Sequence, residues 1–215
     1  MNIELVIFDM DGLMFDTERV SREAWKIAGN KVNIAVDDEL FSQFLGTNSN
    51  HITNILINKF GENSPYKELI SERNIIADEL IDMNGLVVKK GLKELLTYLK
   101  NNNIKRAVAT STSRERALKL LTLGEVVNDF DYIICGDQVT KSKPDPEIFL
   151  KAAEKLNVIP ENCIVLEDSR FGVYAAKNAG MHPIMVPDLL APDEELLSMI
   201  YKQATNLEEV IELLK

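Results

Sequence analysis

The sequence predicts an α/β protein in which a doubly wound parallel sheet carries an inserted all-helical domain. Three observations support this fold class. Residues 5–8 form a continuous apolar run, which is typical of a strand buried on both faces. Residues 18–86 show only helical periodicity, whereas helices and strands alternate from Gly91 onward. We therefore expect a core formed by residues 1–17 and 87–215, with residues 18–86 as a helical cap domain.

The first predicted strand ends at two aspartates, Asp9 and Asp11, followed by Gly12. Residues two apart on an extended backbone face the same way, so both carboxylates can address one small volume. An ordinary turn is an alternative, because Asp and Gly favour turns. A calcium loop is excluded, because its twelfth position needs a glutamate and is Val20 here. Close like charges favour a divalent metal site with a nucleophile.

The segment after Thr17 contains four helical stripes of apolar residues. They begin near Val20, Leu40, Ile52 and Leu69, and the last follows Pro65, which suits a helix start. No stretch of this segment has the alternation of a strand. Because the segment follows the first strand on the side where ligands bind to such sheets, we expect it to act as a lid.

The remainder of the chain alternates between strands and helices. Gly180 suits the end of one helix, and Thr205 with Glu208 resembles a capping box at the start of the last helix. Together with the first strand, we expect a five-stranded doubly wound core. The further strands are expected at residues 104–110, 132–135, 163–166 and 183–186, and the helices near residues 92–99, 117–121, 148–156 and 171–179.

The composition limits the possible functions. The 215 residues are 46% apolar and 27% charged, as in ordinary globular proteins, and carry a formal charge of −10. This charge disfavours nucleic acid and anionic membranes as partners. The first residues lack the basic region and long apolar stretch typical of a signal peptide, no apolar run approaches roughly 18–20 residues, and Cys135 and Cys163 suit buried reduced thiols. We expect a cytoplasmic protein that is a monomer or weak dimer.

Polar residues follow three further predicted strands. Thr110, Ser111 and Thr112 follow one strand, Lys141 and Lys143 lie after the next, and Glu167 and Asp168 follow a third. Each cluster alone suits a helix cap, a solvated lysine or a turn. Because the carboxyl ends of parallel strands meet at one edge of a sheet, we expect the clusters to converge with Asp9.

This combination of residues fits phosphoryl transfer. A carboxylate such as Asp9 can attack phosphorus when a metal and a cation neutralise the charges. Asp9, Asp168 and a backbone carbonyl offer the oxygen ligands that Mg²⁺ prefers, and Lys143 can offset charge on the phosphoryl group. Thr110 and Ser111 can hold its remaining oxygens.

The motifs, in this order, resemble the haloacid dehalogenase superfamily, in its subgroup with a helical cap. The resemblance covers essentially the whole chain and implies a Rossmann-like core and Mg²⁺ dependence. The motifs are Asp-x-Asp-Gly at 9–12, Thr-Ser at 110–111, Lys-Pro-x-Pro-x-x-Phe at 143–149, Glu-Asp-Ser at 167–169 with Gly172, and Ala-Gly-Met at 179–181.

The resemblance implies a role for each motif residue. Asp9 would be the nucleophile that forms an aspartyl-phosphate, and Asp11 the general acid and base, with its backbone carbonyl on Mg²⁺. Thr110 would bind the phosphoryl group. Lys143 would hold both Asp9 and the phosphoryl oxygens in place. Glu167 and Asp168 would complete the metal site. The carbon–halogen hydrolases of the superfamily lack the second aspartate, so Asp11 favours phosphate chemistry.

The sequence therefore predicts a Mg²⁺-dependent phosphatase that hydrolyses a small phosphorylated metabolite such as a sugar phosphate. A mutase similar to β-phosphoglucomutase is the alternative, supported by Trp25. Such mutases carry a histidine where Ser21 stands here and an arginine just after the cap turn, which reads Gly-Thr-Asn-Ser at 46–49. Arg114 is a candidate substitute for the missing cation, although a solvated helix residue is its simpler interpretation. A non-catalytic binding protein is a third hypothesis.

Substrate choice would depend on polar residues of the cap. The sequence does not distinguish these residues from ordinary solvated ones. The candidates are Arg19, Arg22, Asn48 and Asn50.

Overall fold

The computed structural model describes residues 2–47 and 49–215 and divides the chain into two compact units. The sheet unit comprises the chain up to Phe15 together with Val87–Lys215, and the helical unit is Asp16–Leu86. The first boundary predicted from the sequence lies after residue 17, slightly further along the chain.

Six strands of the described chain form one parallel sheet, in the order β3-β2-β1-β4-β5-β6. The doubly wound parallel sheet predicted from the sequence is confirmed, with one strand more than the five expected. The strands are β1 (Leu5–Phe8), β2 (Lys105–Ala109), β3 (Tyr132–Ile134), β4 (Cys163–Glu167), β5 (His182–Met185) and β6 (Lys202–Gln203).

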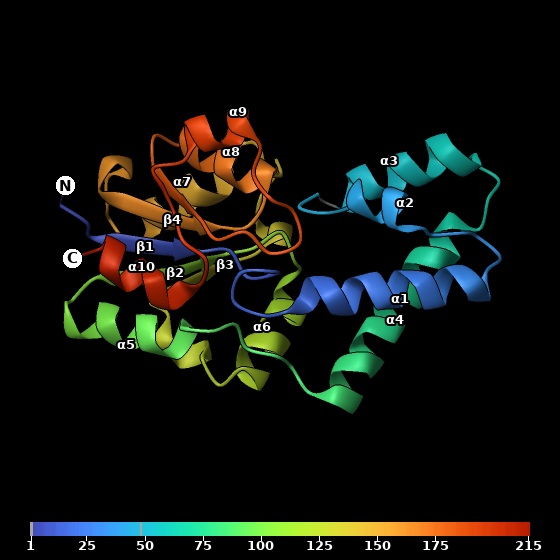
Figure 1. Ribbon diagram of the computed structural model, residues 1–215, viewed down its shortest axis with the longest axis horizontal. Coiled ribbons are helices and arrows are strands. Elements are labelled where there is room, and N and C mark those ends of the chain that lie inside the picture. The colour runs from blue at the N-terminus through green and yellow to red at the C-terminus, as the bar shows by residue number, and fades with distance from the viewer. Residues whose placement is uncertain (1, 48) are drawn as a thin grey trace. The chain divides into compact units, whose positions relative to one another are not determined.

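Helices cover both faces of this sheet (Figure 1). In the figure α7 and α8 lie on one face, and α5 and α10 on the other. The helices are α5 (Leu92–Asn101), α6 (Arg114–Leu123), α7 (Glu147–Lys155), α8 (Arg170–Asn178), α9 (Glu194–Met199) and α10 (Leu207–Leu213), with the short 3₁₀ helices η1 (Val127–Asp129), η2 (Gly136–Gln138) and η3 (Pro160–Asn162).

The core beneath α7 and α8 is a continuous apolar cluster. Leu5 and Ile7 of β1 pack there with Val165 of β4 and Phe149 of α7, all fully buried. Alternate residues of the central strands face opposite helical layers, so both faces are apolar. This explains why β1 is an uninterrupted apolar run in the sequence.

Strand register brings three strand ends to one edge of the sheet. Phe8, the last residue of β1, pairs with Val108 of β2 and with Leu166 of β4. The next residue, Asp9, donates its backbone N–H to the carbonyl of Leu166 at 3.0 Å. Asp9 therefore leaves the sheet beside Glu167, and we call this the carboxyl edge.

The start of α10 differs from the predicted capping box. Asn206 caps the helix, and its side chain accepts from the backbone N–H groups of Glu208 and Glu209. Thr205 instead contacts Glu209, with its hydroxyl 2.6 Å from a carboxylate oxygen. Asparagine and threonine both cap helices well, so residue type alone did not show whether Thr205 or Asn206 is the cap.

The helical unit has one helix for each apolar stripe predicted from the sequence. Trp25 and Phe44 pack with their ring centroids 4.8 Å apart. None of the helices in the described parts of the chain combines the length and apolarity that a membrane span requires. The helices of this unit are α1 (Thr17–Lys31), α2 (Asp38–Ser42), α3 (Ser49–Phe60) and α4 (Tyr66–Asn84).

Candidate functional site

A buried lysine joins two carboxylates at the carboxyl edge. Lys143 lies in the loop between η2 and α7. Its Nζ atom is 2.5 Å from Asp9 Oδ1 and 2.5 Å from Glu167 Oε1. It also donates to the carbonyl of Ala109 at 3.2 Å and lies 4.9 Å from the ring centre of Phe149. The Lys143 side chain is only 4% exposed and that of Glu167 is fully buried. The predicted convergence of Asp9, Lys143 and Glu167 is therefore present.

The electrostatics of this group are dominated by burial and by an excess of negative charge. The pKa of Asp9 is raised to about 8, mainly by burial and also by the charges of Glu167 and Asp11, although Lys143 lowers it. Burial alone would lower the pKa of Lys143, but Asp9 and Glu167 raise it overall, so the ammonium stays protonated. One buried cation is thus too little to hold Asp9 ionised at neutral pH. Additional positive charge at this edge would favour the carboxylate form of Asp9.

Glu167 is fixed by the first turn of α8. Its Oε2 atom accepts from the Ser169 backbone N–H at 3.2 Å and from the Ser169 hydroxyl at 2.9 Å. The same hydroxyl accepts from the backbone N–H of Gly172 at 3.1 Å and so caps the helix. Gly172 is required because a Cβ atom there would lie 1.8 Å from Glu167 Cδ.

We expect Gly172→Ala to destabilise the protein by about 2 kcal/mol and to lower activity by about 10-fold or more. The added methyl group would displace the Glu167 carboxylate from Lys143 and Ser169, and the better helix propensity of alanine would offset only part of this cost. Urea unfolding and a rate measurement test this. The control is Gly61→Ala, where no atom lies within 4 Å of the added Cβ. Its left-handed backbone should give a comparable cost of about 1–2 kcal/mol, but the rate should stay unchanged. Equal rates for the two variants would contradict the assignment.

Three carboxylates at this edge could hold a metal ion. One oxygen atom from each of Asp9, Glu167 and Asp168 can be chosen so that all lie within 4.8 Å of one another. Hard oxygen donors and an excess of negative charge suit Mg²⁺, whose charge would also favour ionised Asp9. The donor set of the chain therefore fits the ion implied by the family resemblance. The Asp11 side chain is not part of this group, and the use of its backbone carbonyl as a ligand stays a prediction.

Asp11 is held instead by the residues that follow β2. Its Oδ2 atom accepts from the Thr112 hydroxyl at 2.8 Å and from the Thr110 hydroxyl at 3.4 Å. Thr110 is 1% exposed. Residues of the first and second motifs are therefore in contact, as predicted. The contact includes Thr112, for which the sequence indicated no individual role. Its only signal was its place in the Thr-Ser-Thr run.

The structure gives Ser111 and Arg114 other surroundings. Ser111 is exposed, and a Cβ at Gly136 would lie 2.2 Å from its carbonyl oxygen, so the two backbones are in close contact. The Arg114 guanidinium donates to the Ile133 carbonyl and to the Gln138 side chain, each at 3.4 Å. Its backbone N–H donates to the Asp137 carboxylate. The structure does not bring Arg114 into the group around Lys143, and substrate contact by either residue stays a prediction.

The helical unit contains an arginine that the sequence did not single out. Arg73 of α4 donates to the Ser21 hydroxyl at 2.5 Å, and its guanidinium carbon lies 5.5 Å from the centre of the Trp25 ring. Two predicted specificity candidates are engaged elsewhere in the unit, Arg19 with Asp16 and Arg22 with Asp38. Asn50 is exposed, and Asn48 lies outside the described residues.

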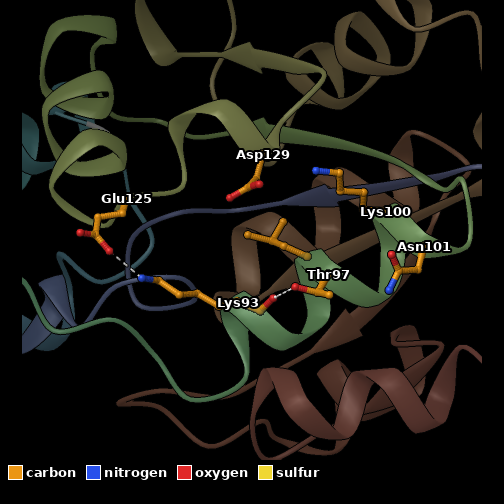
Figure 2. Close-up of a pocket in the computed structure, with 7 residues that line it drawn as sticks. Lys93, Thr97, Lys100, Asn101, Glu125 and Asp129 are labelled. Atoms are coloured by element: carbon orange, nitrogen blue, oxygen red, sulfur yellow. Dashed lines mark hydrogen bonds and ion pairs between the residues drawn. The ribbon is translucent and has the colours of Figure 1, made fainter.

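A surface pocket elsewhere in the sheet unit does not coincide with the carboxyl edge. Figure 2 shows its lining from α5 and from the segment after α6, with Lys93 paired to Glu125 at 2.9 Å. None of the residues predicted to carry the chemistry lines it. Its lining residues are Lys93, Leu96, Thr97, Lys100, Asn101, Glu125 and Asp129.

Comparisons with known proteins agree with the geometry. The family model of the haloacid dehalogenase-like hydrolases matches residues 6–186, so the chain belongs to this family. It is 35% identical over 218 residues to the phosphorylated carbohydrates phosphatase of Thermotoga maritima, with 99% of each chain covered. It is 34% identical over 190 residues to the beta-phosphoglucomutase of Bacillus subtilis, covering 86% of this chain and 83% of the relative.

A solved structure shows the same fold over nearly the whole chain. It is CbbY from Rhodobacter sphaeroides in complex with phosphate, with a TM-score of 0.83 at 26% identity, covering 97% of this chain and 96% of that one. The family predicted from the sequence motifs is thereby confirmed.

Proposed function

We propose that this protein is a Mg²⁺-dependent phosphatase that hydrolyses a small phosphomonoester of the sugar phosphate type through an aspartyl-phosphate. The observation that carries the proposal is the position of the Asp9 carboxylate. It lies at the carboxyl edge beside one buried ammonium group and within reach of two further carboxylates. The Thermotoga maritima relative, a phosphatase of phosphorylated carbohydrates, supports the substrate class.

The reaction would proceed in two steps on this chain's residues. An Asp9 oxygen attacks phosphorus, the ester P–O bond breaks, and Asp11 gives its proton to the departing alkoxide. Water then attacks the phosphorus of the aspartyl-phosphate, Asp11 takes a proton from that water, and the P–O bond to Asp9 breaks. Inorganic phosphate leaves, and Asp9 and Asp11 return to their starting protonation states.

The other residues of the edge stabilise charge. Lys143 would neutralise charge that builds on the phosphoryl oxygens, while keeping Asp9 in place through its hydrogen bond. Thr110 would donate to a phosphoryl oxygen. Asp9, Glu167 and Asp168 would hold Mg²⁺, which when bound supplies Lewis-acid stabilisation of the phosphoryl charge. Residues 16–86 would form the cap that selects the substrate.

A phosphosugar mutase is the second candidate, favoured by Trp25 and by the similarity to the Bacillus subtilis enzyme. The family resemblance places a histidine in such mutases where Ser21 stands here. The Ser21 hydroxyl accepts a hydrogen bond from Arg73 and offers no ring nitrogen for proton transfer. This difference favours hydrolysis over isomerisation.

A panel of phosphorylated metabolites, assayed for released phosphate with Mg²⁺ and with EDTA, tests the proposed function. We expect release from sugar phosphates that is abolished by EDTA and restored by Mg²⁺. Isomerisation of glucose phosphates faster than phosphate release would establish the mutase instead. No turnover of any ester in the presence of Mg²⁺ would favour a binding protein.

A further inference from the structure

We propose that Thr112 is a positioning residue that orients Asp11 for proton transfer to the leaving group. The inference rests on the proposed function, in which Asp11 is the general acid and base. It starts from the short hydrogen bond of 2.8 Å that the Thr112 hydroxyl donates to Asp11 Oδ2. Nothing in the proposed reaction otherwise uses this hydroxyl.

The hydrogen bond would select which oxygen of Asp11 carries the proton. An oxygen that accepts a strong hydrogen bond from a hydroxyl is the poorer place for the acidic proton, which is then carried on Oδ1. Fixing Oδ2 also fixes the plane of the carboxyl group. The general acid would therefore present its proton in one orientation, which matters because proton transfer requires alignment with the leaving oxygen.

Thr112 is itself held firmly enough to serve this purpose. Its backbone N–H donates to the Thr110 hydroxyl at 3.1 Å, and its carbonyl accepts from the Gly136 N–H at 3.0 Å. The backbone of the preceding residue, Ser111, also lies in close contact with Gly136. A positioning group works only if its own conformation is restricted, and these contacts restrict it.

Thr110 is a weaker candidate for this task. Its hydroxyl lies 3.4 Å from the same Asp11 oxygen and already accepts from the Thr112 backbone. At that distance the interaction is weak. The two threonines would therefore have different roles. Thr112 would orient Asp11, and Thr110 would bind the phosphoryl group.

The test compares Thr112→Val with wild type on two substrates that differ in leaving group. One is an alkyl phosphate, whose alkoxide needs a proton as it leaves, and the other is p-nitrophenyl phosphate, whose phenolate does not. The ratio kcat/KM reports the steps up to alcohol release, so later hydrolysis does not mask the effect. We expect kcat/KM to fall about 10–100-fold for the alkyl ester and less than about 3-fold for the aryl ester.

Two further variants separate positioning from a structural role. Thr112→Ser keeps the hydroxyl and should restore the wild-type ratio between the two substrates. Ser113→Ala changes the adjacent exposed residue, whose side chain makes no capping hydrogen bond, and should leave both rates unchanged. If Thr112→Val does not fold, Thr112→Ala is judged by the same ratio.

The outcomes distinguish this inference from the proposed function. Equal losses on both substrates, or no loss on either, would overturn the role of Thr112 while leaving the phosphatase assignment intact. A wild-type protein that releases phosphate from neither ester would overturn the proposed function itself. A selective loss on the alkyl ester, restored by Thr112→Ser, would support the inference.

Discussion

Asp9→Asn is expected to lower kcat for phosphate release by about 10⁴-fold or more, with the fold intact. The amide has nearly the shape of the carboxylate, so the side-chain oxygen can still accept from Lys143. It has no negative charge, however, and is too weak a nucleophile to attack phosphorus. The loss should therefore lie in the chemical step and leave KM little changed.

The measurement is single-turnover phosphate release together with chemical trapping of the intermediate. Hydroxylamine added after an acid quench should convert the acyl phosphate to a hydroxamate at residue 9, detectable by mass spectrometry of the peptide in wild type only. Asp129→Asn, in the surface pocket of Figure 2, is the matched control and should behave as wild type. A hydroxamate at another residue would show that Asp9 is not the nucleophile.

The fold could be predicted wherever burial leaves a pattern in the sequence. β1 is buried on both faces, so its apolar run is unmistakable. β6 was not predicted because it has only two residues, Lys202 and Gln203, and both are polar. It is a strand because it pairs with β5. A strand that short has no periodicity to read.

The site could be predicted only as far as topology decides it. Parallel strands bring Asp9 and Glu167 to one edge, and the motif order supplied Lys143. The contacts of Thr112 with Asp11 and of Gly172 with Glu167 depend instead on side-chain directions after the strands end. The engagement of Arg114 with Asp137 and Gln138 depends likewise on the path of the loop after β3. Spacing in the sequence carries no information on these directions.

Lys143→Met should lower kcat/KM by about 10³-fold and destabilise the folded state by about 3–5 kcal/mol. The ammonium is the partner of two carboxylates at 2.5 Å and of the Ala109 carbonyl. Methionine fills a similar volume but supplies neither charge nor donors, so Asp9 and Glu167 would remain buried together without this cation. Lys141→Met, at an exposed lysine two positions away, is the control and should change neither quantity appreciably.

The destabilisation caused by Lys143→Met should grow as the pH rises above about 8 in metal-free protein. Asp9 titrates near about 4 in the unfolded chain but at about 8 in the folded one, so between these values the folded state holds the extra proton. The free energy of unfolding of wild type therefore falls as pH rises through this range. Because Lys143 lowers the pKa of Asp9, its removal raises that pKa further, and the fall should continue above pH 8 in the variant. Urea unfolding of both proteins with EDTA between about pH 6 and 9 measures the two free energies of unfolding. A difference between variant and wild type that is independent of pH would show that Lys143 does not control the charge of Asp9.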